Sequence, residues 1–138
     1  MSEESNSGLR KIMTAEVRMP FTFSVIDAHD PSVRSAEQRA VTKSLNLGGL
    51  VFETDKMEVE GFHLSFADAT HGRNSLEITL KMGKKSDIVE VLGQVEWYER
   101  RSGPEGVSFV VGVSFVDIQA DALALLRDFL QQFQKPAR

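Results

Sequence analysis

The stretch that decides the fold class reads LEITLKM and covers residues 76–82. Its apolar residues Leu76, Ile78, Leu80 and Met82 alternate with polar residues at every second position. Successive side chains of a β-strand point to opposite faces, so this period predicts a strand with one buried face.

The same alternation recurs on both sides of this stretch. It predicts strands over residues 19–25 upstream and over residues 89–97 and 107–115 downstream. Further strands are expected over residues 38–45 and 50–52, on the two sides of a turn signal at residues 46–49. Turns that contain glycine or proline separate several of these segments. Short strands broken by such turns favour an all-β, mainly antiparallel barrel or sandwich over a parallel sheet.

Trp97 ends an apolar alternation that begins at Val89 and continues through Val91 and Val95. Because Trp97 has the same parity, we expect its indole in the core and the next side chain, Tyr98, on the outside. An exposed tyrosine is either an ordinary surface residue or a ring on which a base could stack.

The period changes near the C-terminus. Apolar residues recur at three- and four-residue spacing from Leu123 to Phe133, which predicts an amphipathic helix. We expect Asp117 to be its N-cap and Pro136 to mark its far end. The apolar stripe needs a partner, either the barrel or a second subunit.

Length and composition indicate a single globular domain. The chain has 138 residues, close to the commonest size of one domain, and its 41% hydrophobic fraction suffices for one core. We expect the domain to cover residues 9–138. The polar residues 1–8 should form a disordered tail, because they offer little apolar surface to bury.

Charge and cysteine content exclude several function classes. The formal net charge is −4, whereas a general DNA or RNA binder carries a basic balance. Without cysteine, the chain has no disulfide, thiol nucleophile or thiolate metal ligand. The polar N-terminus does not resemble a secretory signal, and no apolar run is long enough to cross a bilayer. We therefore expect a cytoplasmic protein without membrane insertion.

Candidate catalytic or metal-binding residues are few. Asp27, His29 and Asp30 suggest metal ligands by their type, but no second cluster stands at a matching spacing. We interpret this segment as a polar loop ahead of Pro31. The sequence contains no Gly-x-Ser-x-Gly elbow, phosphate-binding loop or His-Glu-x-x-His motif, so we expect no enzyme activity, metal or cofactor.

Three segments, taken in order, resemble the PilZ domain family. Residues 41–52 resemble its second signature, in which an Asp or Asn, a Ser and a Gly lead into a Gly-Gly-Leu turn. Residues 93–97 and 111–117 resemble two later strands, and the closing helix also fits. The resemblance spans residues 18–134 and implies a six-stranded β-barrel with a C-terminal α-helix.

The resemblance also implies a ligand, cyclic di-GMP, a bacterial second messenger with two phosphates and two guanines. In this family two arginines four residues apart bind phosphates and guanine edges, because a planar guanidinium donates paired hydrogen bonds. The second arginine falls on Arg18, whereas Thr14 stands at the place of the first. Arg10 and Lys11 are candidate replacements for that cation.

A glycine turn supplies the other half of the implied ligand site. Ser44 stands at the Asp/Asn place of the signature and Asn46 at its Ser place, and Gly48 and Gly49 follow. Hydroxyl and amide groups can hydrogen-bond the ligand, and a glycine backbone can direct N–H groups at an anion. The same four residues would also serve a tight turn that needs glycine for positive φ.

Two functions of different classes follow from these residues. The first is a cyclic di-GMP receptor that regulates a protein partner. The resemblance implies that this partner belongs to motility, pilus or exopolysaccharide machinery and that the receptor takes part in motility or biofilm regulation. The second is a protein–protein adaptor on the same fold that has lost the nucleotide, which Thr14 and Ser44 motivate. Either protein could be a monomer or a homodimer.

Overall fold

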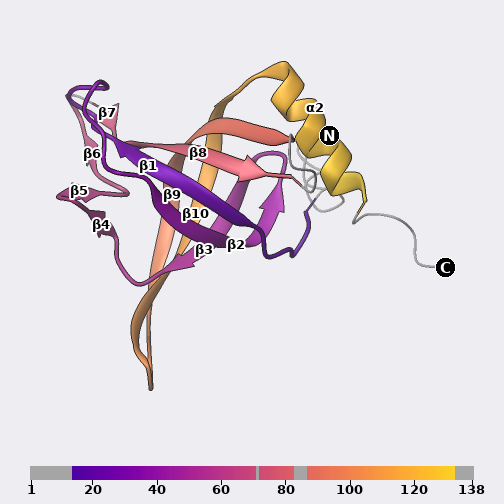
Figure 1. Ribbon diagram of the computed structural model, residues 1–138. Coiled ribbons are helices and arrows are strands. Elements are labelled where there is room, and N and C mark those ends of the chain that lie inside the picture. Colours follow the sequence, from indigo (N-terminus) through magenta and orange to yellow (C-terminus); the bar gives the residue numbers. More distant parts are fainter. Residues whose placement is uncertain (1–13, 71, 83–86, 133–138) are drawn as a thin grey trace, which may run out of the picture.

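Six strands close into an antiparallel barrel, and one helix lies across one of its ends (Figure 1). The computed structural model describes residues 14–70, 72–82 and 87–132. The barrel elements are β1 (Pro20–Ile26), β2 (Gln38–Asn46), β3 (Gly49–Thr54), β8 (Ser75–Lys81), β9 (Ile88–Gly103) and β10 (Gly106–Ile118), and the helix is α2 (Ala120–Gln131). The strand order around the barrel is β1-β2-β3-β10-β9-β8. The expected six-stranded, all-β barrel with a C-terminal helix is confirmed.

The connection between β3 and β8 forms two short hairpins. These are β4 (Glu58–Val59) with β5 (Phe62–His63), and β6 (Ala67–Asp68) with β7 (Gly72–Arg73). They lie at the end of the barrel away from α2 (Figure 1). Met57 and Leu64 of this connection are buried, so the connection closes that end of the core.

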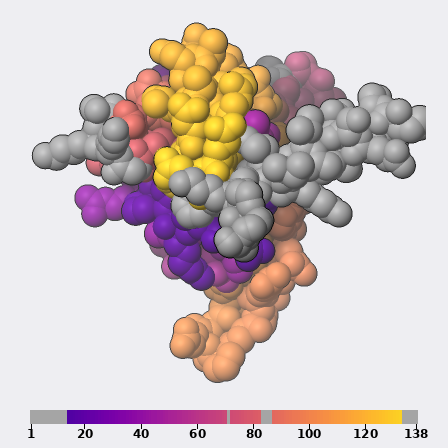
Figure 2. Space-filling view, turned by 90° about the vertical axis from the view of Figure 1, so that its right-hand side faces the viewer, coloured from indigo at the N-terminus to yellow at the C-terminus, as the bar shows by residue number. Residues whose placement is uncertain are grey.

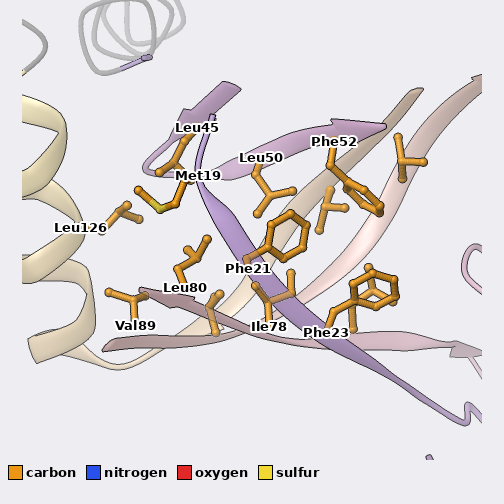
Figure 3. Packing of buried hydrophobic residues seen from close by; sticks show 14 of the residues in the cluster. Met19, Phe21, Phe23, Leu45, Leu50, Phe52, Ile78, Leu80, Val89 and Leu126 are labelled. Atoms are coloured by element: carbon orange, nitrogen blue, oxygen red, sulfur yellow. The ribbon is translucent and has the colours of Figure 1, made fainter. Parts of the chain in front are cut away.

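The alternating apolar residues fill the barrel, as their period predicts (Figure 3). Leu76, Ile78 and Leu80 of β8 are completely buried. Phe21 of β1 packs edge to face on Phe52 of β3, with 5.4 Å between the ring centroids. Such aromatic pairs add packing energy to the burial of their area, so strands that are distant in sequence are held together across the core.

Helix α2 covers the other end of the barrel with its apolar stripe. Leu126 and Leu130 are completely buried. Figure 3 shows Leu126 lying near Met19 and Leu45, two further core residues. The barrel of the same chain is therefore the partner that the stripe requires.

The helix starts later than the sequence predicts. Its N-cap is Gln119, and the expected N-cap, Asp117, is wrong. Asp117 belongs to β10, where it pairs with Leu92 of β9, so pairing in the sheet carries the strand past the capping residue. The expected end of the helix at residues 133–136 and the expected tail at residues 1–8 lie outside the described residues.

A β-bulge in β9 makes the expected core position of Trp97 wrong. Val95 pairs with Val113, and Trp97 pairs with the adjacent Gly112, so β9 carries one extra residue at this point. One extra residue moves all following side chains to the opposite face of the strand. Trp97 therefore lies on the outer face of the barrel, where it is 48% exposed.

The β9–β10 hairpin continues beyond the barrel (Figures 1 and 2). β9 pairs with β8 only as far as Gly93, and from there to its end it pairs with β10 alone. Tyr98 lies on this extension with its ring 6.2 Å from that of Phe109. Tyr98 is exposed, as expected, because β8 no longer pairs with β9 here, although β10 opposite Tyr98 still pairs with β3.

Candidate ligand-binding groove

A groove of about 450 Å³ lies on the outer face of the barrel, where β2, β3, β10 and β9 run side by side. We call it the outer groove. It is lined by Ser44, Asn46, Gly48, Gly49, Leu50 and Val51 of the β2–β3 hairpin and by Glu96, Trp97, Gly112, Val113 and Ser114 of β9 and β10. The four turn residues that the resemblance implies as ligand contacts are thus gathered at one cavity.

The β2–β3 turn is fixed by its own polar groups. The Asn46 side-chain oxygen accepts a hydrogen bond of 2.7 Å from the Gly48 N–H, and the Gly48 carbonyl accepts one of 2.8 Å from the Phe115 N–H. The first bond lies within the turn, and the second holds the turn against β10. Neither Gly48 nor Gly49 has a positive φ, so the expectation that the turn needs glycine for that reason is wrong.

Gly49 is required by close packing instead. A Cβ atom at Gly49 would lie 2.0 Å from the Val113 carbonyl oxygen, so β3 and β10 could not approach as they do. At Gly48 the nearest atom to an added Cβ is the Asn46 side-chain oxygen at 3.6 Å, an ordinary contact. The floor of the groove therefore depends on Gly49 much more than on Gly48.

Trp97 forms an aromatic wall of the outer groove. A Cβ atom at Gly112 would lie 2.2 Å from Cε2 and Nε1 of the indole, so the ring lies directly against the Gly112 backbone. The absence of a side chain at Gly112 gives the indole its place. A half-exposed indole in a groove provides a surface on which a base can stack.

Glu96 is the only charged side chain among the described residues that line the outer groove. Its Oε2 atom accepts a hydrogen bond of 2.7 Å from the Ser114 hydroxyl. Arg73 of β7 lies 3.9 Å from the same oxygen, and its guanidinium also donates to the Val95 carbonyl. The carboxylate is therefore held in place and partly neutralised from outside the groove.

The segment that precedes β1 lies alongside β2. Ala15 and Leu45 exchange two backbone hydrogen bonds of 2.8 and 2.9 Å. The Met19 carbonyl accepts from the Thr42 N–H at 3.0 Å, and the Met19 N–H donates to the Thr42 hydroxyl at 2.9 Å. These bonds fix residues 15–19 beside the strand that leads to the glycine turn.

The residues at or near the arginine positions of the family signature lie at different places relative to the groove. Thr14 lies at its rim, because the Asn46 side-chain amide donates to the Thr14 hydroxyl at 3.5 Å. Arg18 is exposed on the segment beside β2 and is not among the residues that line the groove. Arg10 and Lys11 lie outside the described residues.

The segment that contains Asp27, His29 and Asp30, whose side chains suggest metal ligands by their type, forms a loop between β1 and β2. His29 lies 3.7 Å from an Asp27 oxygen and 3.6 Å from an Asp68 oxygen. Hydrogen bonds from the Ser32 side chain and N–H hold the pKa of Asp30 below its usual value. Within residues 14–70, 72–82 and 87–132, no group of three or more His, Cys, Asp or Glu side chains could hold a metal. Over the same ranges, no helix is long and apolar enough to span a bilayer.

Sequence reasoning missed the half of the groove that β9 and β10 supply. Trp97 was expected inside, and Glu96 and Ser114 carried no pattern that suggested a site. The signal that could have found them is the glycine at position 112, which leaves room for an indole on the neighbouring strand.

Together, the closed antiparallel barrel, the helix across one end and the groove on the outer face define a small β-barrel domain with a grooved surface. Comparison with solved structures identifies this architecture as the PilZ-type fold. The chain therefore folds as a PilZ-type domain. No protein-family model matches its sequence, and no curated protein matches it either.

Three solved structures illustrate the likeness. The PilZ domain of YcgR from Escherichia coli, solved with c-di-GMP, is 11% identical with a TM-score of 0.53, over 86% of this chain and 88% of that one. The Bacillus subtilis inhibitor of motility, MotI/DgrA, is 13% identical with a TM-score of 0.55, over 86% and 48%. The apo state of K. pneumonia MrkH is 12% identical with a TM-score of 0.58, over 86% and 47%. The chain thus spans about half the length of the last two proteins.

Proposed function

We propose that this chain is a cyclic di-GMP receptor that binds the nucleotide in the outer groove and thereby regulates a protein partner. The observation that carries the proposal is the meeting of two features in one cavity. The exposed indole of Trp97 faces the same groove as Ser44, Asn46, Gly48 and Gly49. The likeness in fold to the YcgR domain that was solved with c-di-GMP supports this choice of ligand.

The lining of the groove suits a guanine base. Stacking of a base on an aromatic side chain contributes about 1–3 kcal/mol, and Trp97 offers a half-exposed ring for it. The Ser44 hydroxyl and the Asn46 amide can hydrogen-bond the base or the ribose. We therefore propose that one guanine stacks on Trp97 with its polar groups directed at the β2–β3 turn.

The two phosphates need cations that the described lining does not hold, since its one charged group is Glu96. We assign phosphate binding to Arg18, whose guanidinium suits paired hydrogen bonds to phosphate oxygens. Arg10 and Lys11 are proposed as further phosphate ligands, because they shortly precede Thr14 in the sequence and Thr14 lies at the groove rim. Arg18→Ala should abolish binding. Arg39→Ala should leave it unchanged, because Arg39 is an exposed arginine that pairs with Thr22 of β1 and does not line the groove.

The proposed output is regulation of another protein and not catalysis. The partner would belong to motility, pilus or exopolysaccharide machinery, the setting that the family resemblance implies. The name of one structural neighbour, an inhibitor of motility, supports that direction. A cytoplasmic location would give the receptor access to the nucleotide.

One observation favours a second candidate function, a protein–protein adaptor on the same fold that has lost the nucleotide. Thr14 stands where the signature has an arginine and Ser44 where it has Asp or Asn, and the described groove lining holds a carboxylate and no cation. A dianionic ligand gains less from such a lining than from a basic one.

The intrinsic fluorescence of the chain separates the two candidates. Trp97 is the single tryptophan, so any change in emission on titration with cyclic di-GMP reports on the groove itself. The receptor proposal predicts a saturable change with cyclic di-GMP and none with GTP at the same concentration. An unchanged emission together with capture of a motility or pilus component without nucleotide would favour the adaptor.

A further inference from the structure

We propose that Glu96 recognises the Watson–Crick edge of the guanine that stacks on Trp97, and so selects guanine over other bases. This inference rests on the proposed function, because it concerns one ligand contact in the same groove. It gives a role to the acidic side chain that an anionic ligand would otherwise meet only as a repulsive charge.

The bulge in β9 brings the carboxylate and the indole to the same face. In a regular strand, neighbouring residues point to opposite faces. Here Val95 pairs with Val113 and Trp97 pairs with Gly112, which leaves Glu96 as the extra residue between them. Glu96 and Trp97 consequently both line the outer groove, although they are adjacent in sequence.

The carboxylate has free capacity to accept further hydrogen bonds. An ionised carboxylate offers about four acceptor positions, and the Ser114 hydroxyl donates to one of them at 2.7 Å. The Glu96 side chain is 51% exposed, so its second oxygen can be reached from the groove. Ser114 and Arg73 hold its first oxygen from the side, which fixes the direction in which the second one is presented.

The chemistry of the bases decides what such a group selects. The Watson–Crick edge of guanine carries two neighbouring donors, the ring N1–H and the exocyclic N2 amino group, and a carboxylate accepts from both. Adenine has an acceptor at its ring N1, which a carboxylate repels. Phosphate is also repelled, so Glu96 would direct the ligand to enter this part of the groove with its base.

The test compares cyclic di-GMP with cyclic di-IMP, whose hypoxanthine bases lack only the 2-amino group. Both ligands have the same phosphates, so any general effect of charge in the groove cancels in the ratio of their dissociation constants. Each ligand is titrated into the wild-type chain and into the variants Glu96→Gln and Glu99→Gln. Glutamine keeps an oxygen that can accept from Ser114, and Glu99 is an exposed acid of the same strand that does not line the groove.

The wild-type chain should prefer cyclic di-GMP by about tenfold or more, the value of one charge-assisted hydrogen bond. Glu96→Gln should remove most of that preference, and Glu99→Gln should keep it. An unchanged preference in Glu96→Gln overturns the inference and leaves the receptor function standing. Failure of the wild-type chain to bind either dinucleotide overturns both.

Discussion

The indole of Trp97 lies against the backbone of Gly112 on the neighbouring strand, so closely that a methyl group at Gly112 would be 2.2 Å from the ring. The bulge creates this relationship, because it aligns Trp97 with Gly112 and turns the indole to the outside. The ring is thereby held at one wall of the outer groove with about half of its surface exposed. The proposed stacking site depends on this pair.

Gly112→Ala should weaken cyclic di-GMP binding without unfolding the barrel. The new methyl group displaces the indole, which can move because it is a surface side chain. We expect a change in the tryptophan emission maximum and an affinity reduced by about tenfold, since the base loses much of its stacking surface. Emission spectra and titration of the variant measure both effects. Unaltered emission and affinity would contradict the assigned position of the ring.

Trp97→Ala should reduce affinity for cyclic di-GMP by about 10- to 100-fold, because stacking contributes about 1–3 kcal/mol per base. The free energy of unfolding should change little, since Trp97 is 48% exposed. Tyr98→Ala is the matched control, because Tyr98 is similarly exposed and does not line the groove. Calorimetric titration of the two variants gives the comparison, and equal affinities in both would argue against stacking on Trp97.

Gly49→Ala and Gly48→Ala should differ in stability. A methyl group at Gly49 collides with the Val113 carbonyl at 2.0 Å, and forcing β3 away from β10 should cost about 1–3 kcal/mol of unfolding free energy. At Gly48 the nearest contact is 3.6 Å, so the change should stay within about 0.5 kcal/mol. Thermal unfolding followed by circular dichroism measures the difference. Equal melting temperatures would show that β3 and β10 do not approach as closely as described.

Thr14→Arg should strengthen cyclic di-GMP binding by about tenfold, which is the value of one added charge-assisted hydrogen bond. Thr14 stands where the family signature has its first arginine, and it lies beside Asn46 at the groove rim. Ala124→Arg adds the same charge on the exposed side of α2 and serves as the control. If both variants gain affinity equally, the effect is one of net charge and the position of Thr14 has no special role.

Most of the fold could be predicted from the sequence, because the period of apolar residues reports directly on burial. Leu76, Ile78 and Leu80 are buried as their alternation predicts, and Leu126 and Leu130 of the helix follow the helical period. The number of strands in a closed barrel does not follow from periodicity, and it came from the family resemblance. Strand pairing also decided where α2 begins, which capping preferences alone could not show.

The candidate site could be predicted only in part. Ser44, Asn46, Gly48 and Gly49 stand together in a recognisable turn, and the structure gathers them at one cavity. Trp97 was misplaced, because one extra residue in β9 reverses the parity and a bulge leaves no mark in a hydrophobic pattern. The contribution of Arg18, Arg10 and Lys11 to ligand binding stays a prediction.

Titration calorimetry of the full chain with cyclic di-GMP, with GTP as the control ligand, tests the central proposal most directly. The receptor function predicts saturable heat with a micromolar or lower dissociation constant for cyclic di-GMP and no heat for GTP. The absence of heat at high protein concentration would contradict the receptor function and make the adaptor on the same barrel the leading candidate.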